Sequence, residues 1–189
     1  MKTQLSTYQK SYLNRQSEKL ATAFPGFFSL TGTHQIEPEY IKFQKFHPSI
    51  SENDSQLLCL FYDYICKHSN WRNNVALCEL MRFELAKMNT NNQVTLFASR
   101  YPVAIKNKKA IFAIGKSLYY YALTAASAEV NVVSLSDIEY RIVNWLHQSK
   151  SFESIINWTG LLGYSHNRLR ETVISLVNRK LISESQLNG

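Results

Sequence analysis

The chain has 189 residues, 45% of them hydrophobic, which is enough to fill a core in one large domain or two small ones. Its 21 Lys and Arg residues against 14 Asp and Glu give a net charge of +7, which favours an anionic partner, although the basic residues are scattered. No run of about 18 apolar residues occurs, so the sequence does not support a membrane-spanning helix.

The N-terminal stretch, Met1 to Thr22, alternates polar and apolar residues and lacks the continuous apolar core of a secretory signal. We therefore expect a cytoplasmic protein, and the three cysteines fit such a reducing compartment. Cys59 and Cys66 lie on one predicted helix face, about 10 Å apart along the axis, which is too far for a disulfide. We expect all three cysteines, including Cys78, to be buried free thiols.

Helices are expected throughout the first half of the chain. Pro25 and Gly26 end the first of them, and His47 and Pro48 mark a second boundary. Apolar residues spaced at i, i+4, i+7 and i+8 predict one buried face on the third. The expected helices are Leu5 to Phe24, Glu39 to Phe46, Ser55 to His68, and one that follows a turn at Ser69 to Asn74 and runs to about Met88.

Glu84 is the most unusual residue of this half, because its spacing places a carboxylate on the apolar face of the last helix. An unpaired buried carboxylate costs several kcal/mol or takes up a proton, so it requires a partner. We expect a structural role, either hydrogen-bonded or paired with an arginine. A role as an acid or a ligand is the alternative, but no second carboxylate or histidine stands at a matching offset on that helix.

Beyond an Asn-rich linker at Asn89 to Gln93, the hydrophobic period changes from helical to alternating, which predicts a small sheet. Alternation along Ser117 to Thr124 sends Tyr119 and Tyr121 to one face and Tyr120 to the other. If one face is core, the other presents aromatic rings to solvent or to a partner. The expected strands are Val94 to Phe97, Tyr101 to Ile105, Ala110 to Ile114, Ser117 to Thr124 and Glu129 to Leu135.

The last third predicts three helices. Ser136 and Glu139 form a capping box that begins the first, the second ends at Gly160, and Ser165 is the expected N-cap of the third. Leu181 and Ile182 are expected to start a short wing strand. The end of the chain therefore has a helix-turn-helix-like pattern of the winged-helix type, a fold class that binds either DNA or peptides.

Chemistry-bearing motifs are absent from the sequence. The six glycines never fall at the spacing of a phosphate-binding loop, and the five histidines are scattered. No Cys-x-x-Cys or His-x-x-x-His pair offers a metal site. We therefore expect no independent enzyme activity and no metal or cofactor in this chain.

Several short motifs nevertheless resemble a known family. They are His47-Pro48 followed by Ser51, the helix with Leu58, Phe61 and Tyr64, the run Ala76 to Ala86 (ALCELMRFELA), and Arg100-Tyr101-Pro102-Val103. Together these motifs resemble the MbnC-like accessory proteins that pair with TIM-barrel multinuclear iron oxidases, as in methanobactin biosynthesis. The residues that match, namely Pro48, Leu80, Glu84, Tyr101 and Pro102, have an architectural character.

The resemblance implies a non-catalytic subunit that forms a heterodimer with the oxidase and helps to recognise the leader of a precursor peptide. The pair then converts cysteines of that peptide into oxazolone and thioamide groups, and the product binds copper. The iron belongs to the partner oxidase.

On this basis we expect an α+β protein with two domains. Residues 1–90 form a helical domain that docks the oxidase, and residues 91–189 form a small antiparallel sheet with a winged-helix-like three-helix end that binds the leader. The candidate peptide contacts are Tyr119 and Tyr121 on the aromatic strand face, with Arg100 and Lys106 supplying charge for an acidic leader. For the two tyrosines, ordinary sheet packing is the alternative.

A winged-helix transcription regulator is the competing function. The third C-terminal helix carries His166, Asn167, Arg168 and Arg170, which would reach phosphates or base edges if the helix entered a major groove. Against this, Glu171 lies in its first half, and Arg179 and Lys180 lie at its C-terminus, where cations complement the helix dipole. We therefore expect a peptide and an enzyme as partners, not nucleic acid.

Overall fold

A computed structural model of the chain describes residues 7–47, 54–91, 93–104, 111–112, 115, 117–126, 129–148 and 151–187. Within these residues the fold is α+β, with eight α-helices and one three-stranded antiparallel sheet. The chain divides into two compact units, Met1–Asn89 with Tyr101–Ala113, and Thr90–Arg100 with Ile114–Gly189. None of the described helices is both long enough and apolar enough to cross a membrane.

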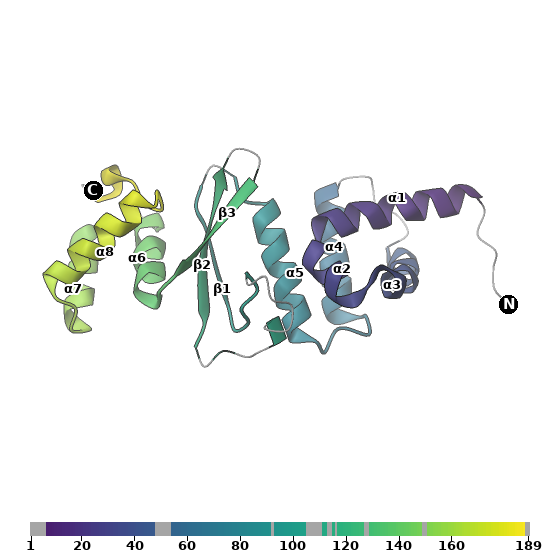
Figure 1. The fold of residues 1–189 in the computed structure, drawn as a ribbon, viewed down its shortest axis with the longest axis horizontal. Helices are drawn as coiled ribbons and strands as arrows, with labels where there is room; N and C mark the ends of the chain where they lie inside the picture. The colour runs from purple at the N-terminus through teal and green to yellow at the C-terminus, as the bar shows by residue number, and fades with distance from the viewer. Residues whose placement is uncertain are drawn as a thin grey trace. The chain divides into compact units, whose positions relative to one another are not determined.

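The first unit is built from five helices (Figure 1), and we call it the helical unit. Phe61 is fully buried at its centre, with ring centroids 5.3 Å from Phe43, 6.2 Å from Tyr40 and 6.3 Å from Phe24. Edge-on and tilted aromatic contacts of this kind add to the free energy gained by burial alone. The five helices are α1 (Thr7–Ala23), α2 (Pro25–Thr31), α3 (Thr33–Phe46), α4 (Asp54–Lys67) and α5 (Val75–Met88).

Pro25 and Gly26 end α1 as predicted, but they also begin α2, which the sequence reasoning missed. Pro25 is the first residue of α2, where its missing N–H is no loss because that amide has no partner within a helix. Similarly, α3 begins at Thr33 and not at Glu39, and it continues through Pro38. A proline in this place removes one intrahelical hydrogen bond, which is why the sequence pattern suggested a later start.

The cysteines are free thiols, but they are not buried as expected. Cys59 is exposed, and Cys66 and Cys78 are half-buried. The buried face of α4 includes Leu57 and Phe61. Cys59 is two positions from each of them and therefore lies on the side of the helix away from the core.

The second unit contains the sheet, and we call it the sheet unit. Its strands are β1 (Thr95–Ser99), β2 (Tyr119–Ala126) and β3 (Glu129–Leu135), in the order β1-β2-β3 with antiparallel neighbours. Phe97 of β1 is paired with Tyr121 of β2, which is paired with Ser134 of β3. Each of these three strands begins and ends within two residues of its predicted bounds.

The two other expected strands do not form in the described residues. Tyr101–Ala104 is a turn in which the Val103 amide donates to the Tyr101 carbonyl at 2.8 Å, and Ile111 and Phe112 lie in a 3-10 turn. Pro102 has no amide to offer a neighbouring strand, which opposes pairing at this point. Tyr101–Ala113 groups with the helical unit, so this unit takes in a segment that follows residue 90 in the sequence.

Three helices follow the sheet: α6 (Asp137–His147), α7 (Phe152–Leu161) and α8 (His166–Asn178). The capping box at Ser136 and Glu139 is confirmed, and Ser165 caps α8 as predicted. The core of this unit joins α6, α7, α8 and β2 through the fully buried side chains of Ile142, Ile155, Leu176 and Ala122.

The expected wing strand after α8 is wrong. Lys180 adopts a left-handed conformation with φ 57, and the Leu181 amide then donates to the Leu176 carbonyl at 3.0 Å, which turns the chain back on the helix. Leu181 and Ile182 are 1% and 5% exposed and belong to the core. The following residues form a short 3-10 helix, η2 (Glu184–Leu187).

Candidate functional site

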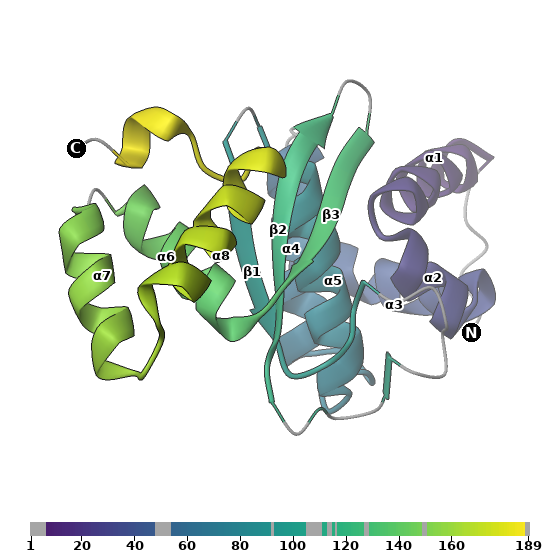
Figure 2. The ribbon, with the colours of Figure 1, turned by 60° about the vertical axis from the view of Figure 1, so that its left-hand side comes forward.

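Among the described residues β3 is one of the two edge strands of the sheet, and β1 is the other. Within the part of the chain that the structure describes, no strand pairs with β3 on the side away from β2 (Figure 2). Its side chains alternate between exposed and half-buried along Glu129–Val132, and only Leu135 at its end is buried. An edge of this kind presents a row of N–H and C=O groups that can pair with another strand.

One end of this edge is already held. Arg179, just after α8, donates from Nη2 to the Ser134 carbonyl at 2.8 Å and forms an ion pair with Glu139. Backbone groups alternate in direction along a strand, so the Ser134 carbonyl that reaches Arg179 indicates that Val132 also directs its N–H and C=O outward. The accessible portion of the edge is therefore Glu129–Val133.

A hollow of about 350 Å³ lies on the α6 face of the sheet, and we call it the aromatic hollow. Tyr120 and Tyr140 have ring centroids 4.6 Å apart, and Trp145 and Trp158 have centroids 4.7 Å apart. Leu118 is 42% exposed at this site. The lining consists of Ala98, Leu118, Tyr120, Asp137, Tyr140, Arg141, Asn144, Trp145 and Trp158.

Charged groups sit beside these rings. Arg141 Nε donates to Asp137 Oδ2 at 2.9 Å, and the Arg141 guanidinium carbon lies 5.8 Å from the centroid of Trp158. The hydrogen bond from the Tyr120 hydroxyl to Asp137 raises the pKa of Tyr120, and the same carboxylate raises the pKa of Arg141. The hollow thus combines aromatic walls with one fixed ion pair, which suits an apolar or aromatic side chain that carries a polar end.

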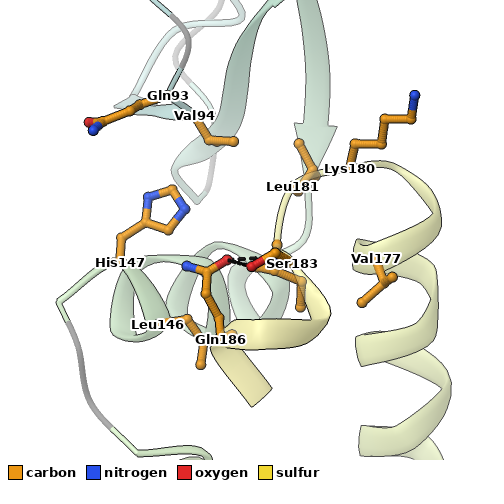
Figure 3. Close-up of a pocket in the computed structure, with 10 residues that line it drawn as sticks. Gln93, Val94, Leu146, His147, Val177, Lys180, Leu181, Ser183 and Gln186 are labelled. Atoms are coloured by element: carbon orange, nitrogen blue, oxygen red, sulfur yellow. Dashed lines mark hydrogen bonds between the residues drawn. The ribbon is translucent and has the colours of Figure 1, made fainter. Parts of the chain in front are cut away.

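A second recess of about 680 Å³ lies at the ends of α6 and α8 (Figure 3). His147 faces it from the end of α6, and its apolar lining consists of Val94, Leu146, Val177, Leu181 and Ile182. Two of its polar residues are already hydrogen-bonded to each other. The backbone amide of Ser183 donates to Gln186 Oε1 at 2.8 Å, and the Ser183 hydroxyl donates to the same oxygen at 3.1 Å. We rank it below the aromatic hollow as a binding site for this reason.

The structure brings two of the four predicted peptide contacts close together. The Arg100 carbonyl accepts from the Gly115 amide at 3.0 Å, and Gly115 lies against the ring of Tyr119, where a Cβ would stand 2.6 Å from a ring carbon. The Arg100 side chain is exposed and Tyr119 is half-buried. Lys106 lies outside the described residues.

Tyr121 is placed differently from the expectation. It is only 3% exposed, beside Leu123 at 0%, so this face of β2 is not an open aromatic surface. Ordinary packing, the alternative considered for the two tyrosines, describes Tyr121. Tyr120, on the opposite face, is the β2 tyrosine that lines the aromatic hollow. Alternation correctly separated these tyrosines but could not tell which face is covered.

Glu84 has the hydrogen-bonded structural role that was predicted. It is 7% exposed, and its carboxylate accepts from the Gly26 amide at 2.6 Å and from the Phe27 amide at 3.4 Å, so it caps the start of α2. Burial raises the pKa of Glu84 to about 7, although the two amides and Lys87 act to lower it. A Cβ at position 26 would stand 2.8 Å from Glu84 Oε1, which explains the glycine there.

Among the other architectural residues, Pro102 is buried in the turn and Tyr101 is half-buried, whereas Pro48 lies outside the described residues. Sequence reasoning missed Glu39, which is 3% exposed. Its carboxylate accepts from Tyr64 at 2.9 Å, Lys42 at 2.7 Å and Asn70 at 3.2 Å. Burial and the hydrogen bond from the Tyr64 hydroxyl to Glu39 raise the pKa of Tyr64. The only sequence signal was a carboxylate next to the apolar stripe of Tyr40 and Phe43.

No group of three or more His, Cys, Asp or Glu side chains gathers at one point in the described ranges. No family model, curated protein or solved structure matches the chain.

Proposed function

We propose that this chain is a non-catalytic accessory subunit of a peptide-modifying complex in the cytoplasm. It forms a heterodimer with a TIM-barrel multinuclear iron oxidase and binds the leader of a ribosomally made precursor peptide. The oxidase, which holds the iron, then converts cysteines of the peptide to oxazolone and thioamide groups of a methanobactin-like copper chelator. The sequence motifs around Glu84 and Pro102 support the family, and the exposed edge of β3 is the observation that carries leader binding.

Strand addition fits this edge for a physical reason. A leader that adds a strand is held by main-chain hydrogen bonds, which need an exposed edge and little side-chain identity. β3 offers the stretch Glu129–Val133 for main-chain pairing. The aromatic hollow lies at the other end of the sheet, by Tyr120 of β2 and Ala98 of β1, and is a separate candidate contact for a longer leader. The exposed Arg100 and the neighbouring Tyr119 stay as proposed secondary contacts for an acidic leader, together with Lys106.

In this proposal the helical unit docks the oxidase. The unit keeps large hydrophobic side chains at its surface, with Phe46 60% exposed, Val75 55% and Met88 48%. Exposed apolar residues of this size are the kind that protein interfaces cover.

Duplex DNA is the competing partner, and the contacts of the basic side chains weigh against it. Arg179 is engaged by Glu139 and the Ser134 carbonyl, and the Arg168 guanidinium lies over the ring of Tyr164, 4.9 Å from its centroid. Cations that are already paired within the protein have less to gain from phosphates.

The first test is co-expression of this chain with a TIM-barrel multinuclear iron oxidase and a cysteine-bearing precursor peptide of the methanobactin type. We expect a one-to-one complex on size-exclusion chromatography and a change in peptide mass only when this chain is present. Equal modification of the peptide in its absence would overturn the proposal. A salt-dependent shift of duplex DNA by the isolated chain would favour the regulator instead.

The second test addresses the β3 edge. Val132→Pro removes the outward amide while leaving the pairing with β2, because proline is tolerated where the missing N–H faces solvent. Val132→Thr is the matched control, since it keeps the amide and the β-branched shape. Fluorescence anisotropy of a fluorescein-labelled leader measures the affinity. We expect the proline variant to bind roughly five- to tenfold more weakly, because it loses about one hydrogen bond and its ring also crowds the added strand. Equal affinity of the two variants would exclude this edge.

A further inference from the structure

The turn between α7 and α8 places two neighbouring leucines in water. Leu161 is 87% exposed, the largest value among the large hydrophobic side chains of the described residues, and Leu162 is 55% exposed. Figure 2 shows this turn at the lower end of α7. Single exposed apolar residues are ordinary, but two adjacent ones at a turn lose hydrophobic free energy until something covers them.

Hydrogen bonds within the turn hold the two leucines in place. The Leu162 amide donates to the Thr159 carbonyl at 3.2 Å, and the Tyr164 amide donates to the same carbonyl at 3.0 Å. Gly163 adopts the left-handed conformation, with φ 76, and its amide donates to the Gly160 carbonyl at 3.0 Å. A helix end closed in this way is a fixed shape, so both side chains are presented without ordering a loose loop.

The space around the turn is open. A Cβ added to Gly160 or to Gly163, on either side of the leucines, would meet no heavy atom within 4 Å. The leucines therefore project from the surface of the described residues. A projecting apolar tip is readily accommodated by a lipid surface, because lipids rearrange around it, whereas a protein partner would need a cavity of matching shape.

Aromatic rings that carry arginines flank the leucines. The Arg168 guanidinium carbon lies 4.9 Å from the ring centroid of Tyr164, and that of Arg141 lies 5.8 Å from the centroid of Trp158. Both rings are half-buried. Tryptophan and tyrosine concentrate where a membrane meets water, because each ring is apolar with one polar group. The rings beside the turn are therefore of the kind that lies at the level of lipid headgroups.

The charge beside the turn favours an anionic surface. Arg168 and Arg170 are exposed in the first turns of α8, at the positive end of its dipole, and Glu171 is the single carboxylate of that helix. Attraction to a charged lipid surface requires no specific contact, so an arginine that rests on a ring still contributes. Charge complementarity thus selects acidic lipids over neutral ones.

We propose that the turn Gly160–Tyr164 inserts Leu161 and Leu162 into the surface of a membrane that contains anionic lipids. Trp158 and Tyr164 then lie at the headgroups, and the arginines of α8 lie among the lipid charges. Two leucines with a few nearby cations give weak, reversible binding and not a permanent anchor. This binding is separate from oxidase docking and leader binding, and it would bring the chain and its partners to a membrane surface.

The test sediments the full chain with vesicles of phosphatidylcholine and phosphatidylserine in equal parts, and with vesicles of phosphatidylcholine alone. We expect binding to the mixed vesicles and much weaker binding to the neutral ones. Leu161→Ser should bind the mixed vesicles roughly tenfold more weakly, because it loses the burial of one leucine. Val75→Ser removes a side chain of the helical unit that is 55% exposed, like Leu162, and this control should bind as wild type does.

Two further measurements separate charge from insertion. Arg170→Gln should weaken binding to the mixed vesicles about fivefold, the effect of one charge near an anionic surface. Phosphatidylcholine with brominated acyl chains, added to the mixed vesicles, quenches tryptophan that approaches the hydrocarbon. We expect quenching in wild type, and Trp158→Phe should lose most of it.

Four outcomes would overturn the proposal. They are absence of binding to the mixed vesicles, equal binding to the two kinds of vesicle, unchanged binding of Leu161→Ser, and a wild-type dimer that Leu161→Ser converts to a monomer on size-exclusion chromatography without lipid. The last result would make the turn an interface between copies. Circular dichroism checks that each variant is folded, and wild-type quenching decides the question if one is not. Because the vesicles contain neither oxidase nor peptide, failure here leaves the proposed accessory role untouched.

Discussion

The helical unit holds two carboxylates in its interior, whereas the sheet unit places its carboxylates and caps near the surface. Glu39 and Glu84 are 3% and 7% exposed, and each receives hydrogen bonds from residues distant in sequence. In the sheet unit Ser136, Ser151 and Ser165 cap helices through amides only three residues away. The buried carboxylates of the helical unit are therefore hydrogen-bonded by residues far away in the sequence. The helix caps of the sheet unit are hydrogen-bonded by residues of the next turn.

The difference has an energetic consequence. A local cap forms with its helix and is worth about 1 kcal/mol, whereas a buried carboxylate must recover the cost of leaving water from partners that arrive only when the unit folds. We therefore expect the helical unit to be sensitive to single changes in its interior and the sheet unit to be tolerant at its helix ends.

The largest effect is expected from the core of the helical unit. Phe61→Ala removes a ring that is 0% exposed and contacts Phe24, Tyr40 and Phe43, so we expect a loss of about 3–5 kcal/mol in the free energy of unfolding. Urea denaturation measures it. Phe61→Leu, which keeps most of the apolar volume, is the control and should lose clearly less. If both variants lost the same free energy of unfolding, the apolar volume that leucine retains would not stabilise the core.

The pH dependence of Glu84 is expected next. Its folded pKa of about 7 exceeds its ordinary value of 4.5, so the folded state retains the proton longer than the unfolded state. The contribution to stability is therefore present below pH 4.5 and is lost as pH rises to about 7, by roughly 3 kcal/mol at most. Glu84→Gln cannot titrate and should remove this slope when urea midpoints are followed against pH. Parallel profiles for the two proteins would show that the carboxyl titrates normally.

Glu39 gives a somewhat smaller effect. Glu39→Ala leaves the hydroxyl of Tyr64, which is 2% exposed, without the carboxylate that accepts from it, and we expect a loss of about 1–3 kcal/mol. Lys42→Ala breaks the same network from its exposed side and should cost below about 1 kcal/mol. Thermal or urea unfolding compares the two variants. A larger loss for Lys42→Ala would contradict the buried network.

The smallest effect is expected at a local cap of the sheet unit. Ser136→Ala removes the side chain that accepts from the Glu139 amide and should cost about 1 kcal/mol. Ser175→Ala, an exposed position within α8, is the matched control and should change stability by less than about 0.5 kcal/mol. If the cap variant matched the control in urea unfolding, local capping would not support α6.

The same comparison explains which parts of the fold were predictable. Helices with a local start, such as α6 and α8, were predicted at the correct N-cap because Ser136 and Ser165 act on amides of the next turn. The start of α2 was missed because its cap, Glu84, lies 58 residues away from Gly26. The sequence told us that Glu84 needs a partner but not which backbone supplies it.

The candidate site shows a similar limit. Alternation placed Tyr120 and Tyr121 on opposite faces of β2, which is correct, but which face is covered depends on how other elements pack and not on β2 itself. The wing after α8 failed for the same reason, since Leu181 and Ile182 have strand-like side chains and yet lie in the core. The free edge of β3 follows from strand order, which no local pattern encodes.

The exposed edge of β3 also has a consequence for how the chain behaves in isolation. The strand EVNVVSL is rich in β-branched residues and carries a single charge, at Glu129, a composition that favours pairing between like strands. At high concentration, molecules would then align β3 against β3, in competition with any ligand of that edge. Solubility should therefore fall with chain concentration and recover once the edge is occupied, which ties the amount of this chain that stays monomeric to the fraction of edges that are covered.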